Sequence, residues 1–284
     1  MSRVIVSFTS IPARMDHLMD VVHNMCRDQT QLPTHVRLYV PPCLHRSNAE
    51  YVVPQALADL QTTYPFFNVV RVPKDKGPAT KVIYALQEFT RPSDLVISID
   101  DDIIYHKQFV QEMVAAHATL PHSLLGFMGT NPPVQAYIHA EFLQRSTGST
   151  ENRGFYKSKT LGGYRGILYP RNLVNDDFFE LFETLSELTL TECKSVIRED
   201  DNFVAMYCEH KQIPMHVIGT FFPGNMQSTV WLERLNFQFR ESGRVDALFG
   251  EQNFSSTMNT FVILRDFFAG LAKPTITEDQ ASAT

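Results

Sequence analysis

Three consecutive aspartates, Asp100, Asp101 and Asp102, follow directly on the apolar run Leu95–Ile99. Carboxylates this close repel one another, and they do not all ionise cheaply unless a cation compensates their charge. The run before them is as apolar as a central strand that is covered on both faces. Side chains at the carboxyl end of such a strand point into the crevice where open α/β sheets bind ligands. The triplet therefore predicts a site for Mg²⁺ or Mn²⁺, hard cations that take oxygen ligands and share their other positions with phosphate oxygens.

Three different roles for the triplet stay open at this point. An acidic turn after a strand needs no metal at all. An EF-hand loop requires a glycine after its acidic residues, whereas Ile103 and Ile104 stand there. A nucleophilic aspartate of the phosphatase type usually lies near the first strand of its domain, whereas this triplet follows the fourth predicted strand.

A second acidic cluster, Glu199-Asp200-Asp201-Asn202, stands about a hundred residues further on and precedes a predicted helix. Aspartate is a favoured helix N-cap, and acidic residues suit the first turn because of the helix dipole. Capping is therefore one interpretation of this cluster. One aspartate can also cap the helix while the other takes part in chemistry.

Strand and helix patterns alternate through the first hundred residues. Strands are predicted at Val4–Phe8, Val36–Val40, Asn68–Val72 and Leu95–Ile99. Helices are predicted between them, at Met15–Gln29, Tyr51–Leu60 and Ala79–Phe89. This alternation is typical of a parallel sheet with right-handed crossovers. We therefore predict an α/β fold with a Rossmann-type, mostly parallel central sheet flanked by helices.

The second half of the chain is less regular. Residues 121–175 combine short strands with Gly, Pro and polar loops. Helices are predicted at Gln108–Ala118, Asp176–Leu188 and Asp201–Lys211, a strand at Met215–Ile218, and helical spacing from Val230 to Leu271. We expect these elements to continue the sheet of the first half.

Composition narrows the class of protein. With 284 residues, 44% of them hydrophobic and 20% charged, the chain is globular and has room for a sizeable core. A net charge of −6 without a Lys/Arg-dense stripe argues against a nucleic-acid partner. The four cysteines lack zinc-type spacing, which favours reduced thiols. Because a strand begins just after Met1 and no apolar stretch approaches the roughly 20 residues of a membrane span, we expect a soluble, cytoplasmic protein without signal peptide or transmembrane segment.

These features together resemble one family. An apolar strand ending in Asp-x-Asp, about a hundred residues after an N-terminal βα unit, is similar to the metal-binding motif of GT-A-fold nucleotide-sugar glycosyltransferases. Ser7–Arg14 resembles the first strand and nucleotide-binding loop of a bacterial and large-virus branch, and Gly77–Lys81 resembles the segment before its Asp-x-Asp strand. The resemblance covers roughly residues 4–220. It implies a single GT-A-like domain over 1–284, with a nucleotide-binding half at 1–105 and an acceptor-binding half at 106–284.

The resemblance implies a role for each aspartate of the triplet. Asp100 would accept from the ribose hydroxyls of the donor, and it is also a candidate metal ligand. Asp102 would ligate the cation directly, and Asp101 would either assist it or contact the metal ligands without contacting the metal. The implied cofactor is Mn²⁺ or Mg²⁺, which neutralises the charge growing on the leaving nucleotide.

The two flanking segments supply four further candidates for donor binding. Lys81 lies at a predicted helix start, where the helix N-terminus and the ammonium both favour a phosphate. A solvated surface lysine is the alternative. Arg14 would contact the base or the diphosphate, unless it is a surface charge at a helix start. Thr9 and Pro12 would shape the nucleobase pocket.

The segment Leu161–Tyr169 holds three glycines in five positions, which allows backbone to approach a ligand closely. In the resembled family such a segment borders donor sugar and acceptor, and Gly163 is the candidate here; a β-bulge or hairpin turn is the alternative. Inverting members of the family use an aspartate like Asp201 as the general base that deprotonates the acceptor hydroxyl. The extra aspartate before Asn202 departs from the commonest pattern, so Asp200 stays open as the base.

Histidines and aromatic residues complete the candidates. His216 is a possible third metal ligand, as in some family members, although a lone histidine on a short strand is more often structural. His106 and His139 are weaker candidates. Aromatic residues that would line an acceptor groove, if they are not core, are Trp231, Phe237, Phe239 and Phe249.

We therefore expect a metal-dependent glycosyltransferase of the hexosyl- or pentosyltransferase class. It would move a sugar from a nucleotide-diphosphate donor, a UDP-sugar by family frequency, to a glycan hydroxyl with inversion. A nucleotidyltransferase acting on sugar phosphates is an alternative, but it usually has a Gly-rich basic loop where this chain has Thr9–Pro12. A non-catalytic glycan-binding domain of the same fold is a second alternative.

Overall fold

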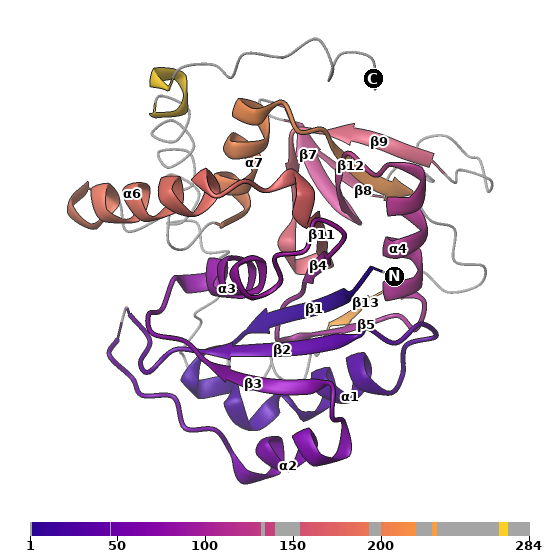
Figure 1. The fold of residues 1–284 in the computed structure, drawn as a ribbon, viewed down its shortest axis with the longest axis vertical. Coiled ribbons are helices and arrows are strands. Elements are labelled where there is room, and N and C mark those ends of the chain that lie inside the picture. The colour runs from indigo at the N-terminus through magenta and orange to yellow at the C-terminus, as the bar shows by residue number, and fades with distance from the viewer. Residues whose placement is uncertain are drawn as a thin grey trace.

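The structure is a computed structural model that describes residues 2–45, 47–131, 134–139, 154–192, 200–219, 229–231 and 267–271. Its largest element is an eight-stranded sheet to which both halves of the chain contribute (Figure 1). The strands are, in spatial order, β3 (Phe67–Arg71), β2 (His35–Val40), β1 (Val4–Thr9), β4 (Leu95–Ser98), β11 (Ile167–Pro170), β6 (Leu124–Gly126), β12 (Met215–Gly219) and β9 (Gly154–Ser158). Among these strands β11 and β9 run against the common direction. The predicted α/β fold, with a mostly parallel central sheet flanked by helices, is confirmed.

The strands predicted from β-branched runs are present nearly as expected. β1 to β4 begin and end within one residue of the predicted bounds, and β12 extends the predicted strand by one residue. Their apolar composition reflects burial on both faces of the sheet. In β1, Val6 and Phe8 belong to one core and Ile5 to the other, and all three are fully buried.

The order of the strands creates a switch point between β1 and β4. The chain proceeds outward from β1 to β2 and β3, and then returns across β1 to form β4 on its other side. In sheets of this kind, ligands bind in the crevice outside the carboxyl ends of the strands at such a reversal. The loop after β1, which begins at Ser10, and the loop after β4, which carries the aspartate triplet, therefore face the same crevice.

Helices cover both faces of the sheet, with a separate core under each set. One core includes residues of α1 (Met19–Cys26), α2 (Gln55–Thr63) and α4 (Phe109–Thr119). The other includes residues of α3 (Thr80–Glu88), α6 (Asp177–Glu192) and α7 (Asp200–Lys211). Figure 1 shows α3 and α6 on one side of β1, and α1 and α2 on the other. Within the described ranges, none of the helices is long and apolar enough to cross a membrane.

Two predicted helices begin several residues before the observed ones, and α6 ends four residues after its predicted end at Leu188. The helix predicted at Tyr51–Leu60 begins only at Gln55, because Pro54 disfavours helical backbone in the residue before it. The helix predicted at Met15–Gln29 is divided into a 3₁₀ turn at Pro12–His17 and α1. The other 3₁₀ turns are Gly77–Ala79, Gly163–Arg165 and Arg171–Leu173.

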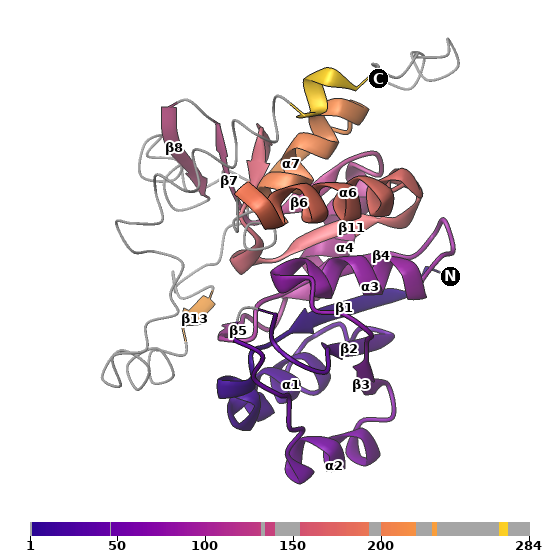
Figure 2. The same ribbon diagram turned by 90° about the vertical axis from the view of Figure 1, so that its left-hand side faces the viewer.

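Two small sheets lie beside the large one. One is built by β10 (Thr160–Leu161), β7 (Met128–Asn131) and β8 (Val134–His139). In the other, β5 (Ile103–Tyr105) pairs antiparallel with β13 (Thr229–Trp231), which Figure 2 shows beside it.

The pairing of β13 with β5 corrects one prediction. Helical spacing was predicted from Val230 onward, but Val230 and Trp231 belong to β13, and the backbone of Trp231 lies opposite Ile103, next to the aspartate triplet. A strand that pairs with a segment over a hundred residues away has no local pattern that reveals it. Phe237, Phe239 and Phe249, and residues 272–284, lie outside the described residues.

Gly166 provides a test of how tightly the glycine-rich segment packs. Its φ is +86°, and a Cβ at this position would lie 2.5 Å from a ring carbon of Phe109. Gly166→Ala combines left-handed backbone strain with overpacking, so we expect it to lower the free energy of unfolding by roughly 2–4 kcal/mol. The control Gly270→Ala adds a Cβ with no contact within 4 Å among the described residues and should melt like the wild type. Equal melting temperatures of both variants in circular dichroism would contradict this packing.

Candidate active site

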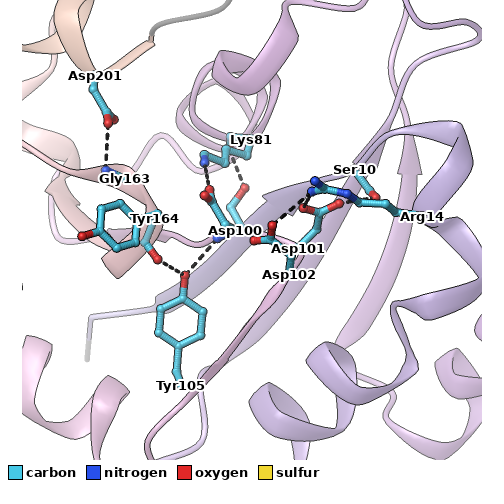
Figure 3. A network of polar contacts seen from close by, with 11 residues as sticks. Ser10, Arg14, Lys81, Asp100, Asp101, Asp102, Tyr105, Gly163, Tyr164 and Asp201 are labelled. Atoms are coloured by element: carbon cyan, nitrogen blue, oxygen red, sulfur yellow. Dashed lines mark hydrogen bonds and ion pairs between the residues drawn. The ribbon is translucent and has the colours of Figure 1, made fainter. Parts of the chain in front are cut away.

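The loops after β1 and β4 meet through Asp101. Its carboxylate accepts a hydrogen bond from Ser10 Oγ at 2.5 Å and another from Arg14 Nη1 at 2.8 Å (Figure 3). The carbonyl of Ser10 accepts in turn from the hydroxyl of Tyr51 at 2.8 Å. Asp101 is buried, so these bonds replace the water that a charged group would otherwise require. The middle aspartate of the triplet therefore anchors the first loop at the switch point.

Lys81 lies between the two acidic clusters. It belongs to the first turn of α3, it is only 4% exposed, and its Nζ lies 2.5 Å from Oδ1 of Asp100. Burial alone would lower the pKa of Lys81, but the charges of Asp100 and Asp200 outweigh burial and raise the pKa above its ordinary value. The alternative of a solvated surface lysine is therefore wrong. Lys81 is a buried, permanently charged ammonium.

Asp102 has the weakest compensation within the triplet. Its nearest cation is Arg14, at 3.4 Å from Oδ2, whereas Asp100 and Asp101 have charged partners at 2.5 and 2.8 Å. Burial and the charges of Asp101 and Asp100 raise the pKa of Asp102 to about 6. A carboxylate in this state gains from any added positive charge.

The second acidic cluster opens helix α7, where Asp200 and Asp201 occupy the first turn. The backbone N–H of Gly163 donates to Oδ2 of Asp201 at 2.9 Å. Burial raises the pKa of both carboxyls, and the charge of Asp200 helps to raise that of Asp201 to about 8. Both carboxyls lie in the field of Lys81, but Asp200 is buried, whereas Asp201 keeps some solvent contact beside the glycine-rich segment. Of the two, Asp201 is better placed to meet a substrate.

One tyrosine that the sequence did not single out links the two acidic sites. The hydroxyl of Tyr105 accepts a hydrogen bond from the backbone N–H of Asp100 at 3.0 Å and donates to the carbonyl of Tyr164 at 3.0 Å. Ser10 was missed in the same way, although it lies within the quoted loop Ser7–Arg14. Each has a partner that is distant in sequence, Tyr164 for Tyr105 and Asp101 for Ser10, and no local pattern predicts such pairs.

Three other candidates have structural partners of their own. Thr9 Oγ1 donates to the carbonyl of Tyr39 at 2.9 Å, and Pro12 opens the 3₁₀ turn that carries Arg14. His106 packs against aromatic rings, and burial lowers its pKa to about 4.

His216 is not brought to the aspartates. Its Nδ1 lies 3.1 Å from Oγ of Ser123, and β11 and β6 stand between its strand and β4. Three strand spacings correspond to roughly 14 Å. His139 lies in β8 of the small sheet. His216 therefore does not join the aspartate triplet as a metal ligand.

The donor atoms at the crevice suit a cation that arrives with its substrate. Across the described residues, no group of three or more His, Cys, Asp or Glu side chains is arranged to hold a metal ion. Mg²⁺ is usually held by one or two carboxylates together with substrate phosphates rather than by an all-protein cage. Asp102 and Asp100 supply two such carboxylates, and both side chains retain solvent contact. These residues fit a cation that a diphosphate helps to hold.

Comparisons with known proteins add a resemblance of fold. No protein-family model and no curated protein matches the sequence. Two crystal structures of S. aureus TarS residues 1–349, one in complex with UDP, are similar to this chain at 13% and 12% identity and TM-scores of 0.45. They cover 76% and 77% of this chain, which spans 58% of the TarS chain. At this identity and TM-score the similarity describes the arrangement of elements and carries nothing about the substrate.

The pKa of Asp201 leads to a prediction about stability and pH. A carboxyl whose pKa is higher in the folded chain stabilises the fold fully below its unfolded pKa, about 4, and that contribution is lost as pH rises through about 8. Asp201→Asn keeps an acceptor for Gly163 but cannot ionise. We expect its free energy of unfolding to exceed that of the wild type by an amount that grows between these two pH values, by up to about 1.4 kcal/mol per pH unit.

Chemical denaturation between pH 4 and 9 would measure this difference. The control Asp176→Asn changes a carboxylate that is 93% exposed, and it should follow the wild type at every pH. A constant difference between Asp201→Asn and the wild type would show that Asp201 is not held in an unfavourable charged state.

Proposed function

We propose that this chain is a metal-dependent glycosyltransferase that moves a sugar from a nucleotide-diphosphate donor to a glycan hydroxyl, with inversion at the anomeric carbon. The observation that carries the proposal is that two acidic sites, far apart in the sequence, both lie in the field of Lys81. The β4 aspartates have open carboxylates next to the cations Arg14 and Lys81, and Asp201 has a raised pKa beside Gly163. The first site suits a cation and a diphosphate, and the second suits a general base.

The donor would bind at the switch point between β1 and β4. Asp102 and Asp100 would hold the cation, Mn²⁺ or Mg²⁺, and Asp100 would also accept from the ribose. Arg14 would bring positive charge to the diphosphate, and Lys81 at the start of α3 would do the same. Thr9, at the end of β1, and Pro12, in the loop that Asp101 anchors, would border the nucleobase. A UDP-sugar is favoured by its frequency as a donor in the family that the sequence resembles.

The chemistry would be a single displacement. When bound, the cation supplies a Lewis acid that stabilises the departing diphosphate. Asp201 accepts the proton of the acceptor hydroxyl as that oxygen attacks the anomeric carbon. The bond between the anomeric carbon and the diphosphate oxygen breaks, and the nucleoside diphosphate leaves with the electron pair. A base whose pKa lies near the working pH is the most effective for such a step.

Nucleotide binding tests the first half of the proposal. Because the described residues contain no preformed metal cage, we expect Mn²⁺ alone to bind weakly and UDP to bind tightly only with Mn²⁺. Asp102→Asn should raise the Kd for UDP in Mn²⁺ by roughly 10–100-fold, whereas the exposed control Asp176→Asn should leave it unchanged. Isothermal titration calorimetry measures both. UDP affinity that is equal with and without Mn²⁺ would exclude the metal site.

Turnover distinguishes a transferase from its alternatives. A panel of nucleotide sugars with Mn²⁺ should yield hydrolysis of at least one UDP-sugar, and the NMR spectrum of the first-formed sugar should show inverted anomeric configuration. Retention would exclude Asp201 as a base for direct displacement. Pyrophosphate release from UTP and a sugar phosphate would favour the nucleotidyltransferase instead. Metal-dependent UDP binding without any turnover would favour a binding domain.

Gly163 tests the base without altering it chemically. A Cβ at Gly163 would lie 2.7 Å from Oδ1 of Asp201, so Gly163→Ala must push the carboxylate aside. We expect kcat for UDP-sugar hydrolysis to fall at least tenfold, since small displacements of catalytic groups cost this much, while UDP affinity changes little. The control Gly162→Ala places its Cβ 3.4 Å from Met128, an ordinary contact. Equal kcat values for the two variants would contradict the role of Asp201.

A further inference from the structure

Tyr105 is held rigidly from several directions. The amide side chain of Asn24 donates to its carbonyl at 2.9 Å and accepts from its N–H at 2.8 Å. Its ring packs on that of Phe109, with centroids 4.3 Å apart, and the side chain is 1% exposed. The position of its hydroxyl is therefore determined by helices α1 and α4 and not by the crevice itself.

The hydroxyl of Tyr105 belongs to a continuous path between the two acidic sites (Figure 3). It accepts from the N–H of Asp100 and donates to the carbonyl of Tyr164. The preceding residue, Gly163, donates its own N–H to Asp201. Three hydrogen bonds thus connect the end of β4 to the carboxylate at the start of α7.

Lys81 also connects the two acidic sites, but it does so through its charge. Lys81 interacts with Asp100 and with the α7 aspartates through its charge, and an ammonium on a four-carbon stem can turn toward an incoming diphosphate. The Tyr105 hydroxyl is neutral, and its two partners are backbone groups. The two bonds of the Tyr105 hydroxyl therefore contain no charged side chain for which a bound ion would compete.

We propose that Tyr105 is a positioning residue that sets the location of Asp201 relative to Asp100, and so the distance between the base and the bound donor. This inference rests on the proposed function. Without the hydroxyl, the glycine-rich segment loses its link to β4, and Gly163 no longer holds Asp201 at a defined distance. The alternative role is local: the hydroxyl would merely satisfy two buried backbone groups.

Tyr207 offers a matched control for the local role. It is also 1% exposed, and its hydroxyl accepts from the N–H of Asn175 at 3.3 Å and donates to Oδ1 of Asp177 at 3.0 Å. Tyr105→Phe and Tyr207→Phe each remove one buried hydroxyl with one donor and one acceptor as partners. Both should remain folded with similar losses in melting temperature. Only the first lies on the path to Asp201.

Amide hydrogen exchange, followed by NMR, tests the coupling without any substrate. The amide of Asp100 loses its acceptor in Tyr105→Phe whether the role is positioning or local, so it does not discriminate. The amide of Gly163 does, because its acceptor Asp201 is unchanged by the substitution. We expect exchange at Gly163 to accelerate roughly tenfold or more in Tyr105→Phe and to stay at the wild-type rate in Tyr207→Phe. Unchanged exchange at Gly163 in Tyr105→Phe overturns the proposal.

A double-mutant cycle on kcat for UDP-sugar hydrolysis, measured with Mn²⁺, tests the consequence for catalysis. Tyr105→Phe should lower kcat roughly tenfold while the Kd for UDP changes less than about threefold. In the Asp201→Asn background it should cause little further loss, because its effect acts through Asp201. Additive losses, or a loss confined to UDP affinity, overturn the proposal. If the wild type turns over no donor but Gly163 responds as expected, the proposed function fails while the coupling of the two sites stands.

Discussion

Charge compensation by two cations, one of them buried, is the constraint on which the acidic site depends. Asp100, Asp200 and Asp201 converge on Lys81, which is almost without solvent contact. Taking ions out of water costs several kcal/mol each unless opposite charges and hydrogen bonds replace the lost hydration. Arg14 compensates the charge of Asp101 in the same way. The acidic groups can lie close together because these two cations come from elements on either side of them.

The two cations compensate the acidic charge only in part, and the carboxyls that stay under-compensated are the candidates for chemistry. Asp102 and Asp201 retain raised pKa values, which means that their charged forms lack sufficient positive partners. Perturbed carboxyls in a crevice are more common at functional sites than elsewhere. Here the two differ in their needs: Asp102 lies in a triplet that gains from a cation, while Asp201 is held by one backbone N–H and gains from a proton. In the proposed function, this difference distinguishes Asp102, in the donor site, from Asp201, the base.

Hydrogen bonds from two hydroxyl groups supply geometry that the ion pairs alone do not. Ser10 ties the loop after β1 to Asp101, and Tyr105 ties the end of β4 to the glycine-rich segment. Charged side chains can exchange partners when a ligand enters, whereas both partners of the Tyr105 hydroxyl are backbone groups. The site therefore combines charged side chains with a frame of hydrogen bonds, and Tyr51 and Tyr105 anchor that frame in the core that also contains Phe109.

Local patterns were enough to predict the alternating strands and helices, because hydrophobic periodicity is a property of neighbouring residues. They also revealed both acidic clusters, because the carboxylates of each cluster are adjacent in the chain. They also pointed to Lys81 and Gly163, which the fold brings to those clusters. The partners of these residues became visible only in three dimensions. Folding makes Asp101 an anchor, pairs Lys81 with Asp100, places His216 several strands away and joins β13 to β5. Such pairings depend on strand order and register, and these are set by contacts between residues that are far apart in the chain.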